Sequence, residues 1–207
     1  MHKLEYETKS FVAGLNLVAG VDEVGRGPLA GPVLSACVAI SKDQEIDEEL
    51  LREVRDSKKI SEKKREKLCA LIFSNIKNVG VAMCDREKID EINILQASLL
   101  SMKKAVENLS IKPEMIFVDG NNEIRGLNIS QKTVIKGDSK VFCIAAASIV
   151  AKVTRDNMMK EYHRLYPEYG FDKHKGYGTK LHIEMLQIHG ACPIHRRTFS
   201  PVAKVIA

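Results

Sequence analysis

The sequence predicts an α/β fold built as a single domain. Short apolar segments with the length of strands alternate with longer segments whose apolar residues recur every three or four positions. A glycine-rich segment, residues 25–32, lies between two of the apolar segments, and acidic residues stand where several of them end. The chain contains no internal repeat, low-complexity tract or Pro/Gly/Ser linker, so residues 1–207 are expected to share one core.

The short apolar segments are the predicted strands. Residues 17–21 and 32–40 are apolar runs typical of buried strands. Residues 79–84, 115–118 and 133–135 are shorter runs of the same kind. Glycine, proline or polar residues stand next to these runs, as expected where strands end.

Four longer segments are the predicted main helices. Ser61 is a suitable N-cap for a helix whose apolar residues follow at helical spacing. Residues 92–109 have a clear amphipathic pattern that stops before Pro113. Residues 141–166 form a long helix that starts with small residues, and residues 181–188 form the last main helix after a glycine-rich loop.

Acidic residues follow three of the predicted strands. Asp22 and Glu23 come after the first strand, and Asp119 and Asp138 each come after a later one. A lone Asp after a strand is usually a turn former or a helix cap. Three such strand ends in one sheet would bring the carboxylates together, and repelling carboxylates make physical sense around hard divalent cations such as Mg²⁺ or Mn²⁺. Two such cations about 4 Å apart are suited to phosphodiester hydrolysis.

Asp22 and Glu23 present a geometric conflict. Neighbouring residues of a regular strand point to opposite faces of the sheet, so the two side chains cannot both reach one site from ideal strand geometry. Gly25 and Gly27 indicate that the strand is already breaking there, which would let both take part. Asp22 is the stronger candidate ligand, and Glu23 is expected to act from the side or through water.

The glycine-rich segment lacks the P-loop pattern. Its Arg26 has the planar guanidinium that clamps a phosphate, and the flanking glycines allow a ligand to approach the backbone closely. Taken alone, a tight turn between strands explains Gly-Arg-Gly better than a binding site does.

Bulk properties exclude several classes of protein. The net charge of +5 permits a nucleic-acid partner without requiring one. No segment has the roughly 18 apolar residues of a membrane span, and residues 1–7 do not form a secretory signal. The five cysteines form no C-x-x-C pair, so neither a zinc site nor a disulfide framework is expected. We therefore expect a cytoplasmic protein with reduced cysteines and no membrane partner.

Eight segments match one known family in the family's own order, from about residue 4 to residue 203. They are residues 19–32, 56–59, 117–120, 135–139, 145–156, 174–179, 193–196 and 199–202. Read together, they resemble ribonuclease HII, of the ribonuclease H superfamily. The resemblance implies a ribonuclease H-like mixed β-sheet flanked by helices, with roughly residues 180–207 as a helical C-terminal extension.

The resemblance also implies a metal-dependent endonuclease. It implies that Asp22, Glu23, Asp119 and Asp138 bind Mg²⁺ or Mn²⁺, and its Ile-Lys-Gly-Asp match favours Asp138 over Asp156 as the fourth carboxylate. The substrates would be RNA–DNA hybrids and duplex DNA with embedded ribonucleotides. Cleavage would fall on the 5′ side of a ribonucleotide and leave a 3′-hydroxyl and a 5′-phosphate.

Substrate recognition follows from the same resemblance. Gly25, Arg26, Gly27 and Tyr177 would read the 2′-hydroxyl and the RNA-to-DNA junction, which fits the role of that hydroxyl in separating RNA from DNA. Lys58 is a candidate phosphate contact. Further cations are expected to track the phosphate backbone: Lys173, Lys175, Arg155 and Arg196. For His174 and His195 a structural and a catalytic role both stay open. No obligatory protein partner is evident, and a monomer is expected.

Three alternatives stay open at this point. Ribonuclease HIII is the nearest relative of the family, but it usually carries an N-terminal substrate-binding domain and lacks the arginine of Gly-Arg-Gly. Only about 20 residues precede Asp22 and Arg26 is present, which favours ribonuclease HII. A binding module that keeps the fold without catalysis would not need the four carboxylates. A metal-binding protein unrelated to nucleic acid would not need Arg26, Lys58 or Tyr177.

Overall fold

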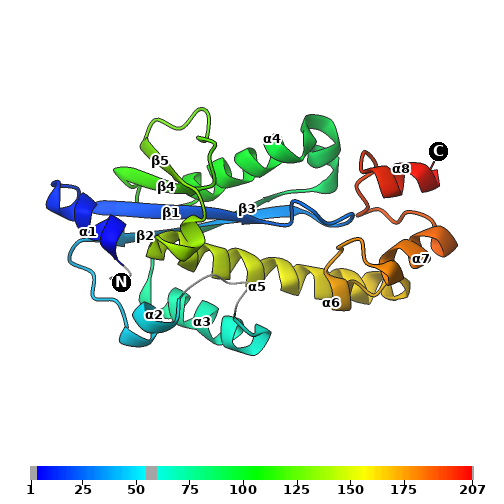
Figure 1. Cartoon of the computed structure of the whole chain (residues 1–207), viewed down its shortest axis with the longest axis horizontal. Helices are drawn as coiled ribbons and strands as arrows, with labels where there is room; N and C mark the ends of the chain where they lie inside the picture. Colours follow the sequence, from blue (N-terminus) through cyan, green and yellow to red (C-terminus); the bar gives the residue numbers. More distant parts are fainter. Residues whose placement is uncertain (1–3, 55–59, 207) are drawn as a thin grey trace.

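The computed structural model describes residues 4–54 and 60–206, and its centre is a mixed β-sheet with the strand order β3-β2-β1-β4-β5 (Figure 1). The strands are β1 (Leu17–Val24), β2 (Val33–Ser41), β3 (Val79–Cys84), β4 (Met115–Asp119) and β5 (Ser130–Val134). β1 is antiparallel to β2 and parallel to β4, while β2 and β3 pair antiparallel and β4 and β5 pair parallel. The predicted fold class, a mixed sheet flanked by helices, is confirmed.

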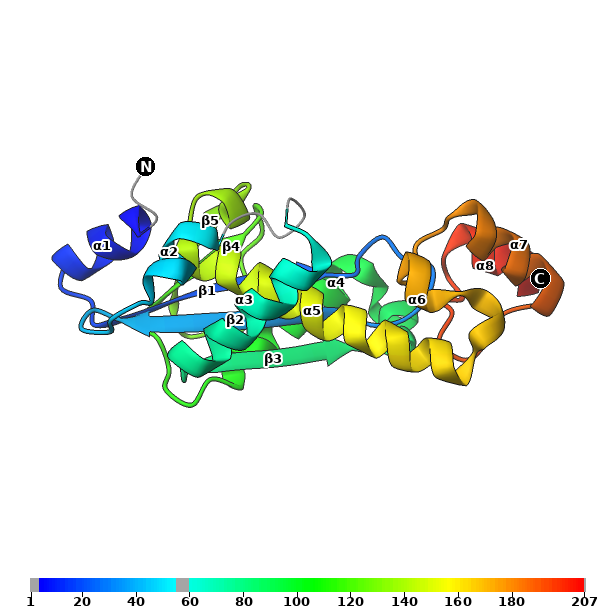
Figure 2. The same ribbon diagram turned by 90° about the horizontal axis from the view of Figure 1, so that it is seen from below.

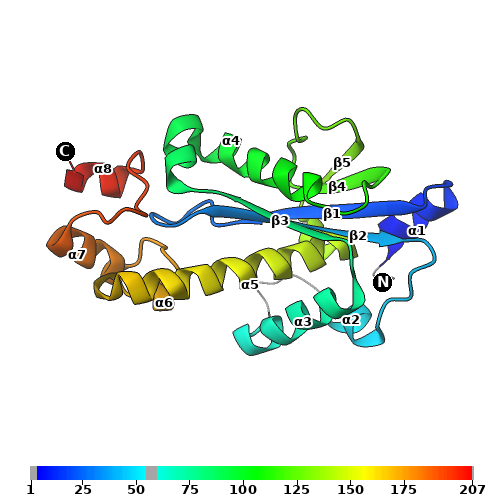
Figure 3. The same cartoon turned by 180° about the vertical axis from the view of Figure 1, so that it is seen from behind.

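Helices cover both faces of this sheet. They are α1 (Glu5–Val12), α2 (Glu48–Glu53), α3 (Glu62–Asn75), α4 (Arg86–Glu107), α5 (Phe142–Leu165), α6 (Phe171–His174), α7 (Lys180–His189) and α8 (Ser200–Ile206), with short 3-10 helices η2 (Gly137–Ser139) and η3 (Pro167–Tyr169). α4 lies on one face and α5 and α3 lie on the other, while α6 to α8 gather at the end of the molecule opposite α1 (Figures 2 and 3). None of the helices described here is long and apolar enough to cross a membrane.

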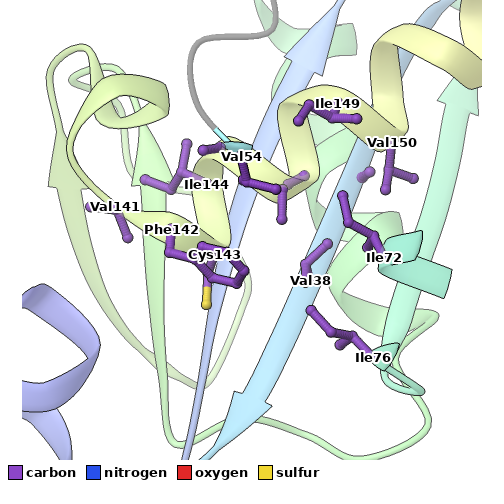
Figure 4. Packing of buried hydrophobic residues seen from close by; sticks show 14 of the residues in the cluster. Val38, Val54, Ile72, Ile76, Val141, Phe142, Cys143, Ile144, Ile149 and Val150 are labelled. Atoms are coloured by element: carbon purple, nitrogen blue, oxygen red, sulfur yellow. The ribbon is translucent and has the colours of Figure 1, made fainter. Parts of the chain in front are cut away.

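Strict alternation along β1 and β2 divides the core into two layers. Val18 and Val38 pack with α3 and α5, whereas Ala19 and Cys37 pack on the face covered by α4. Figure 4 shows the first layer, with Ile72 pointing from α3 toward Val38. Residues of equal parity in β1 and β2 therefore share a face, and this parity decides where the acidic side chains of β1 lie.

α5 lies unusually close to β1 because residue 20 is a glycine. A Cβ at Gly20 would overlap the backbone of Cys143 and Ile144 in the first turn of α5. The following residues, Ala145, Ala146 and Ala147, keep the helix slim where it crosses the sheet. The close contact brings Ser148, near the start of α5, beside Asp22 at the acidic end of β1.

The structure departs from the sequence-based prediction at several boundaries. β1 does not break after Val21, because Asp22 and Glu23 stay in regular register with Ala36 and Ser35 of β2. α4 begins at Arg86, where Asp85 caps it, and the non-helical backbone of Asn93 divides it into two helical parts. The second part, whose first N–H groups donate to Oδ1 of Asn93, corresponds to the predicted amphipathic helix. The cap by Ser61 is confirmed, with a hydrogen bond from Lys64 N to its Oγ. The short helices α1, α2 and α6 were not predicted, whereas α8 lies within the helical C-terminal extension that the resemblance implied.

Candidate active site

Asp22 and Asp119 lie side by side on the face of the sheet that α5 covers. Val21 pairs with Val118 in the parallel register of β1 and β4, and the next residue of each strand is one of these two aspartates. Both have the parity of the residues that pack with α5. Asp22 is buried, and its Oδ1 accepts a 2.7 Å hydrogen bond from Glu23 N.

Glu23 is electrostatically linked to the same two aspartates although it follows Asp22 on a regular strand. β4 ends at Asp119, so no further residue of β4 covers the edge of β1 beside Glu23. Its Oε1 lies 3.3 Å from Nη1 of Arg26. The expectation that the strand breaks at this point is wrong, and the end of the neighbouring strand provides the room instead.

Burial and mutual repulsion make the carboxyl groups of Asp22 and Glu23 reluctant to ionise. Desolvation raises the pKa of Asp22 well above its usual value, and the charges of Glu23 and Asp119 raise it further, while a hydrogen bond with Ser148 works in the opposite direction. Burial also raises the pKa of Glu23, with Arg26 lowering it and Asp119 raising it. A bound cation would offset this repulsion and favour the ionised carboxylates.

Asp138 is attached to this group through the backbone next to it. Gly137 N donates a 2.7 Å hydrogen bond to Oδ1 of Asp119, and Asp138 follows in η2. Within the described ranges, no three His, Cys, Asp or Glu side chains already stand close enough to enclose a metal ion. The oxygen donors suit Mg²⁺ or Mn²⁺ in type, and the four residues form a neighbourhood of carboxylates rather than a closed cage.

Two buried arginines hold the glycine turn that follows Glu23. Arg196 donates to the carbonyl oxygens of Gly25, Arg26 and Gly31. Arg155 of α5 donates in the same way to three further carbonyls, those of Ala30, Pro32 and Lys175. Both arginines are 0% exposed, so the expectation that they track the phosphate backbone of a substrate is wrong.

The carbonyl bonds to Arg196 orient the opposite side of each peptide group. In a trans peptide the C=O and the following N–H point in opposite directions. The carbonyls of Gly25 and Arg26 point at the buried guanidinium, so the N–H groups of Arg26 and Gly27 point away from it. The turn thus presents two backbone donors on the side where Arg26 and Gly27 are exposed.

Tyr177 lies against the same turn. A Cβ at Gly27 would come 3.6 Å from Cε1 of the Tyr177 ring, and 43% of Tyr177 is exposed. The structure therefore brings Gly25, Arg26, Gly27 and Tyr177 together, as the family resemblance implied, and their role in recognition stays a prediction.

The other candidate residues have more ordinary surroundings. Lys58 lies outside the described residues. Lys173 is exposed, whereas Nζ of Lys175 donates to the carbonyl oxygen of Asp172. Asp156 is buried and paired with Lys152 at 2.7 Å, which agrees with the preference for Asp138. Sequence reasoning missed Ser148, whose only signal was a serine ending a run of small residues in the predicted helix.

The fold and this arrangement define a class of protein. A mixed sheet with neighbouring carboxylates where β1 and β4 end, beside an exposed turn of backbone donors, is the architecture of a ribonuclease H-type nuclease. The family model described as Ribonuclease HII matches residues 19–202, and the chain belongs to this family.

Individual relatives agree with this assignment. A ribonuclease HII from Endomicrobium trichonymphae is 51% identical to this chain over 98% of its length and 94% of the relative's. The crystal structure of ribonuclease H2 from Pyrococcus horikoshii has a TM-score of 0.76 and 30% identity, covering 91% of this chain and 96% of that one. A Bst ribonuclease HIII in complex with Mn²⁺ has a TM-score of 0.70, covering 93% and 70%, and at 17% identity it shows the fold alone.

Removing one charge from the carboxylate group should stabilise the metal-free protein. Asp22→Asn keeps an acceptor for Glu23 N but relieves the repulsion from Glu23 and Asp119. In the presence of a chelator we expect the melting temperature to rise by about 2–4 °C, which corresponds to about 1 kcal/mol in a chain of this size. Asp85→Asn, which changes an exposed helix cap, is the matched control and should give no such rise. A lower melting temperature for Asp22→Asn would contradict the electrostatic account.

Replacing Arg196 by lysine should destabilise the protein, because the glycine turn loses hydrogen bonds to its carbonyls. Arg196→Lys keeps the charge, but one ammonium cannot serve the three carbonyls that the guanidinium reaches. We expect the free energy of unfolding in urea to fall by about 2–4 kcal/mol, because carbonyls and a charge are left buried without partners. The neighbouring exposed Arg197→Lys should change it little. Equal stability of the two variants would show that the carbonyl contacts are dispensable.

Proposed function

We propose that this chain cuts the RNA strand of RNA–DNA hybrids and incises duplex DNA on the 5′ side of an embedded ribonucleotide, leaving a 3′-hydroxyl and a 5′-phosphate. The observation that carries the proposal is the pair Asp22 and Asp119 on one face of the sheet, beside a turn with backbone donors that begins at Gly25, three residues after Asp22. Membership of the ribonuclease HII family supports the same reaction.

Asp22, Glu23, Asp119 and Asp138 would hold Mg²⁺ or Mn²⁺. Their fit rests on the donor chemistry, since hard divalent cations prefer carboxylate oxygens and would offset the repulsion between the three linked carboxylates. When bound, two such cations supply Lewis acidity that stabilises charge on the attacking and leaving oxygens of a phosphodiester.

The chain's own residues would bind and orient the scissile strand. The N–H groups of Arg26 and Gly27 are suited to donate to a 2′-hydroxyl oxygen, which deoxyribose lacks. The exposed guanidinium of Arg26 is suited to an adjacent phosphate. The ring of Tyr177 offers a flat surface for the nucleotide at the RNA-to-DNA junction.

Residues 1–207 would work as one catalytic domain, with roughly residues 180–207 as a helical C-terminal extension. Contacts between the C-terminal part and the glycine turn support this proposal, including the β-bridge of His195 with Ala30 and the three carbonyl contacts of Arg196. The cytoplasmic location, the monomeric state and the lack of an obligatory protein partner stay predictions.

Cleavage of a duplex with one embedded ribonucleotide tests the proposed reaction. With Mg²⁺ or Mn²⁺ the wild type should cut it, and Asp119→Asn should cut it at least about 100-fold more slowly. Losing a contact that only orients a metal ligand typically costs about 10- to 100-fold in activity, and losing the ligand itself should cost more. Asp85→Asn should retain the wild-type rate. No cut by the wild type, or equal cutting by Asp119→Asn, would point to a binding module without catalysis. Cutting of a continuous hybrid alone would favour the activity of a ribonuclease HIII.

Tyr177 should govern selectivity rather than chemistry. Tyr177→Ala removes the ring beside Gly27 and leaves the carboxylates in place. We expect the ratio of kcat/KM for the single-ribonucleotide duplex to kcat/KM for a continuous hybrid to fall about tenfold. Tyr166→Ala is a control that removes a tyrosine elsewhere in the C-terminal part, where it packs beside Met159 and Phe171. An unchanged ratio in Tyr177→Ala would remove this residue from the recognition site.

A further inference from the structure

Two buried histidines form a chain of hydrogen bonds inside the C-terminal part. His182 of α7 and His195 are both 0% exposed, and their Nε2 atoms lie 3.0 Å apart. The other ring nitrogen of His182, Nδ1, lies 2.9 Å from the carbonyl oxygen of Tyr177. The other ring nitrogen of His195, Nδ1, lies 3.0 Å from the backbone N of Cys192.

The two ends of this chain fix where its protons lie. The N–H of Cys192 can only donate, so Nδ1 of His195 accepts and its Nε2 carries the proton. The carbonyl of Tyr177 can only accept, so Nδ1 of His182 carries a proton and its Nε2 accepts from His195. Each ring then holds one proton, as a neutral imidazole must, and a second proton on either ring would oppose an existing donor.

The surroundings of the pair favour this neutral state. The ring of His182 stacks on His174 at 4.5 Å and meets the edge of Phe171 at 5.4 Å. His195 packs against Tyr169 at 4.9 Å. Burial lowers the pKa of both His182 and His195 to about 4, in agreement with the proton positions that the geometry requires.

The chain of hydrogen bonds joins the two halves of the recognition site. His195 forms a β-bridge with Ala30, and Arg196 N donates to the carbonyl of Leu29, so the backbone at this end is attached to the glycine turn. At the other end His182 holds the carbonyl of Tyr177, whose ring lies against Gly27. The contacts therefore run from Ala30 beside the turn, through the rings of His195 and His182, to Tyr177, whose ring returns to the turn at Gly27.

We propose that His182 and His195 are positioning residues that hold Tyr177 over the Gly25–Gly27 turn and thereby set the preference for an embedded ribonucleotide. The inference rests on the proposed function of Tyr177. Packing alone does not need this arrangement, since apolar side chains would fill the same volume without burying polar nitrogens. The Tyr177 carbonyl also accepts a 2.8 Å hydrogen bond from Thr179 N, and His182 supplies the second donor. Two directed hydrogen bonds fix the position of this carbonyl more sharply than packing can.

Two amides at position 182 test the proposal. The side-chain amide of Asn reaches about as far as Nδ1 of histidine, so His182→Asn keeps a donor for the Tyr177 carbonyl. The amide of Gln reaches about as far as Nε2, so His182→Gln keeps the contact with His195 and loses that donor. We expect the ratio of kcat/KM for the single-ribonucleotide duplex to kcat/KM for a continuous hybrid to fall about five- to tenfold in His182→Gln and to recover in His182→Asn.

General damage to the fold would lower both activities together and leave the ratio unchanged. His189→Gln, an exposed histidine of the same helix, is the matched control and should keep the wild-type ratio. The double variant His182→Gln/Tyr177→Ala should show no further fall beyond Tyr177→Ala alone, because both changes act through one side chain. A ratio that falls in Tyr177→Ala but is unchanged in folded His182→Gln overturns the positioning role and leaves the proposed function intact.

The proton positions give a second readout that needs no variant to fold. In the wild type, imidazole ¹⁵N chemical shifts at neutral pH should show the proton on Nδ1 of His182 and on Nε2 of His195. The same tautomer in both rings, or a charged ring, would overturn the proposal. An unchanged ratio in Tyr177→Ala would overturn it together with the role proposed for Tyr177.

Discussion

Arg155 and Arg196 enclose the turn between β1 and β2 from two sides, and the rest of the site depends on their bonds to its carbonyls. One guanidinium comes from α5 and the other from the C-terminal part, and neither is exposed to water. Burial lowers the pKa of Arg155 to about 10 and that of Arg196 to about 9, so both stay charged at neutral pH. A charge-assisted hydrogen bond to each carbonyl offsets the desolvation of the arginines and fixes the path of the chain directly after Asp22 and Glu23.

The carboxylates next to this turn destabilise the same region of the protein that the two arginines stabilise. Asp22, Glu23 and Asp119 repel one another in a setting with little water, and Ser148 and Gly137 stabilise them only in part. Such a group lowers stability unless a cation is bound, which is typical of a site kept for chemistry rather than for folding. The close packing of α5 on Gly20 keeps these side chains together against their repulsion.

Sequence patterns predicted the helices and strands that depend on apolar spacing and capping residues. The strands β1 to β4, the cap by Ser61 and the long helix α5 follow from apolar spacing and capping residues, and the acidic strand ends pointed to Asp22 and Asp119. The polar strand β5 was predicted only at its last two residues, and Tyr177 came from the family resemblance alone. The role of Arg155 was mispredicted, because its partner Pro32 lies 123 residues away and a surface arginine looks the same in sequence. The continuation of β1 past Val21 was also hidden, since pairing with β2 overrides the acidic composition.

The proposed recognition by backbone donors would explain why the turn needs so much support. A flexible loop would lose conformational entropy each time its N–H groups met a substrate, and that loss would weaken discrimination between ribose and deoxyribose. Carbonyls fixed by Arg196 leave the N–H groups of Arg26 and Gly27 aimed outward before any substrate arrives. Tyr177 reaches the same turn from a segment about 150 residues later in the chain, so its position also needs a fixed connection. The bridge of His195 to Ala30 and the ring of His182 supply one, so the proposed selectivity at the turn would depend on buried groups that touch no substrate.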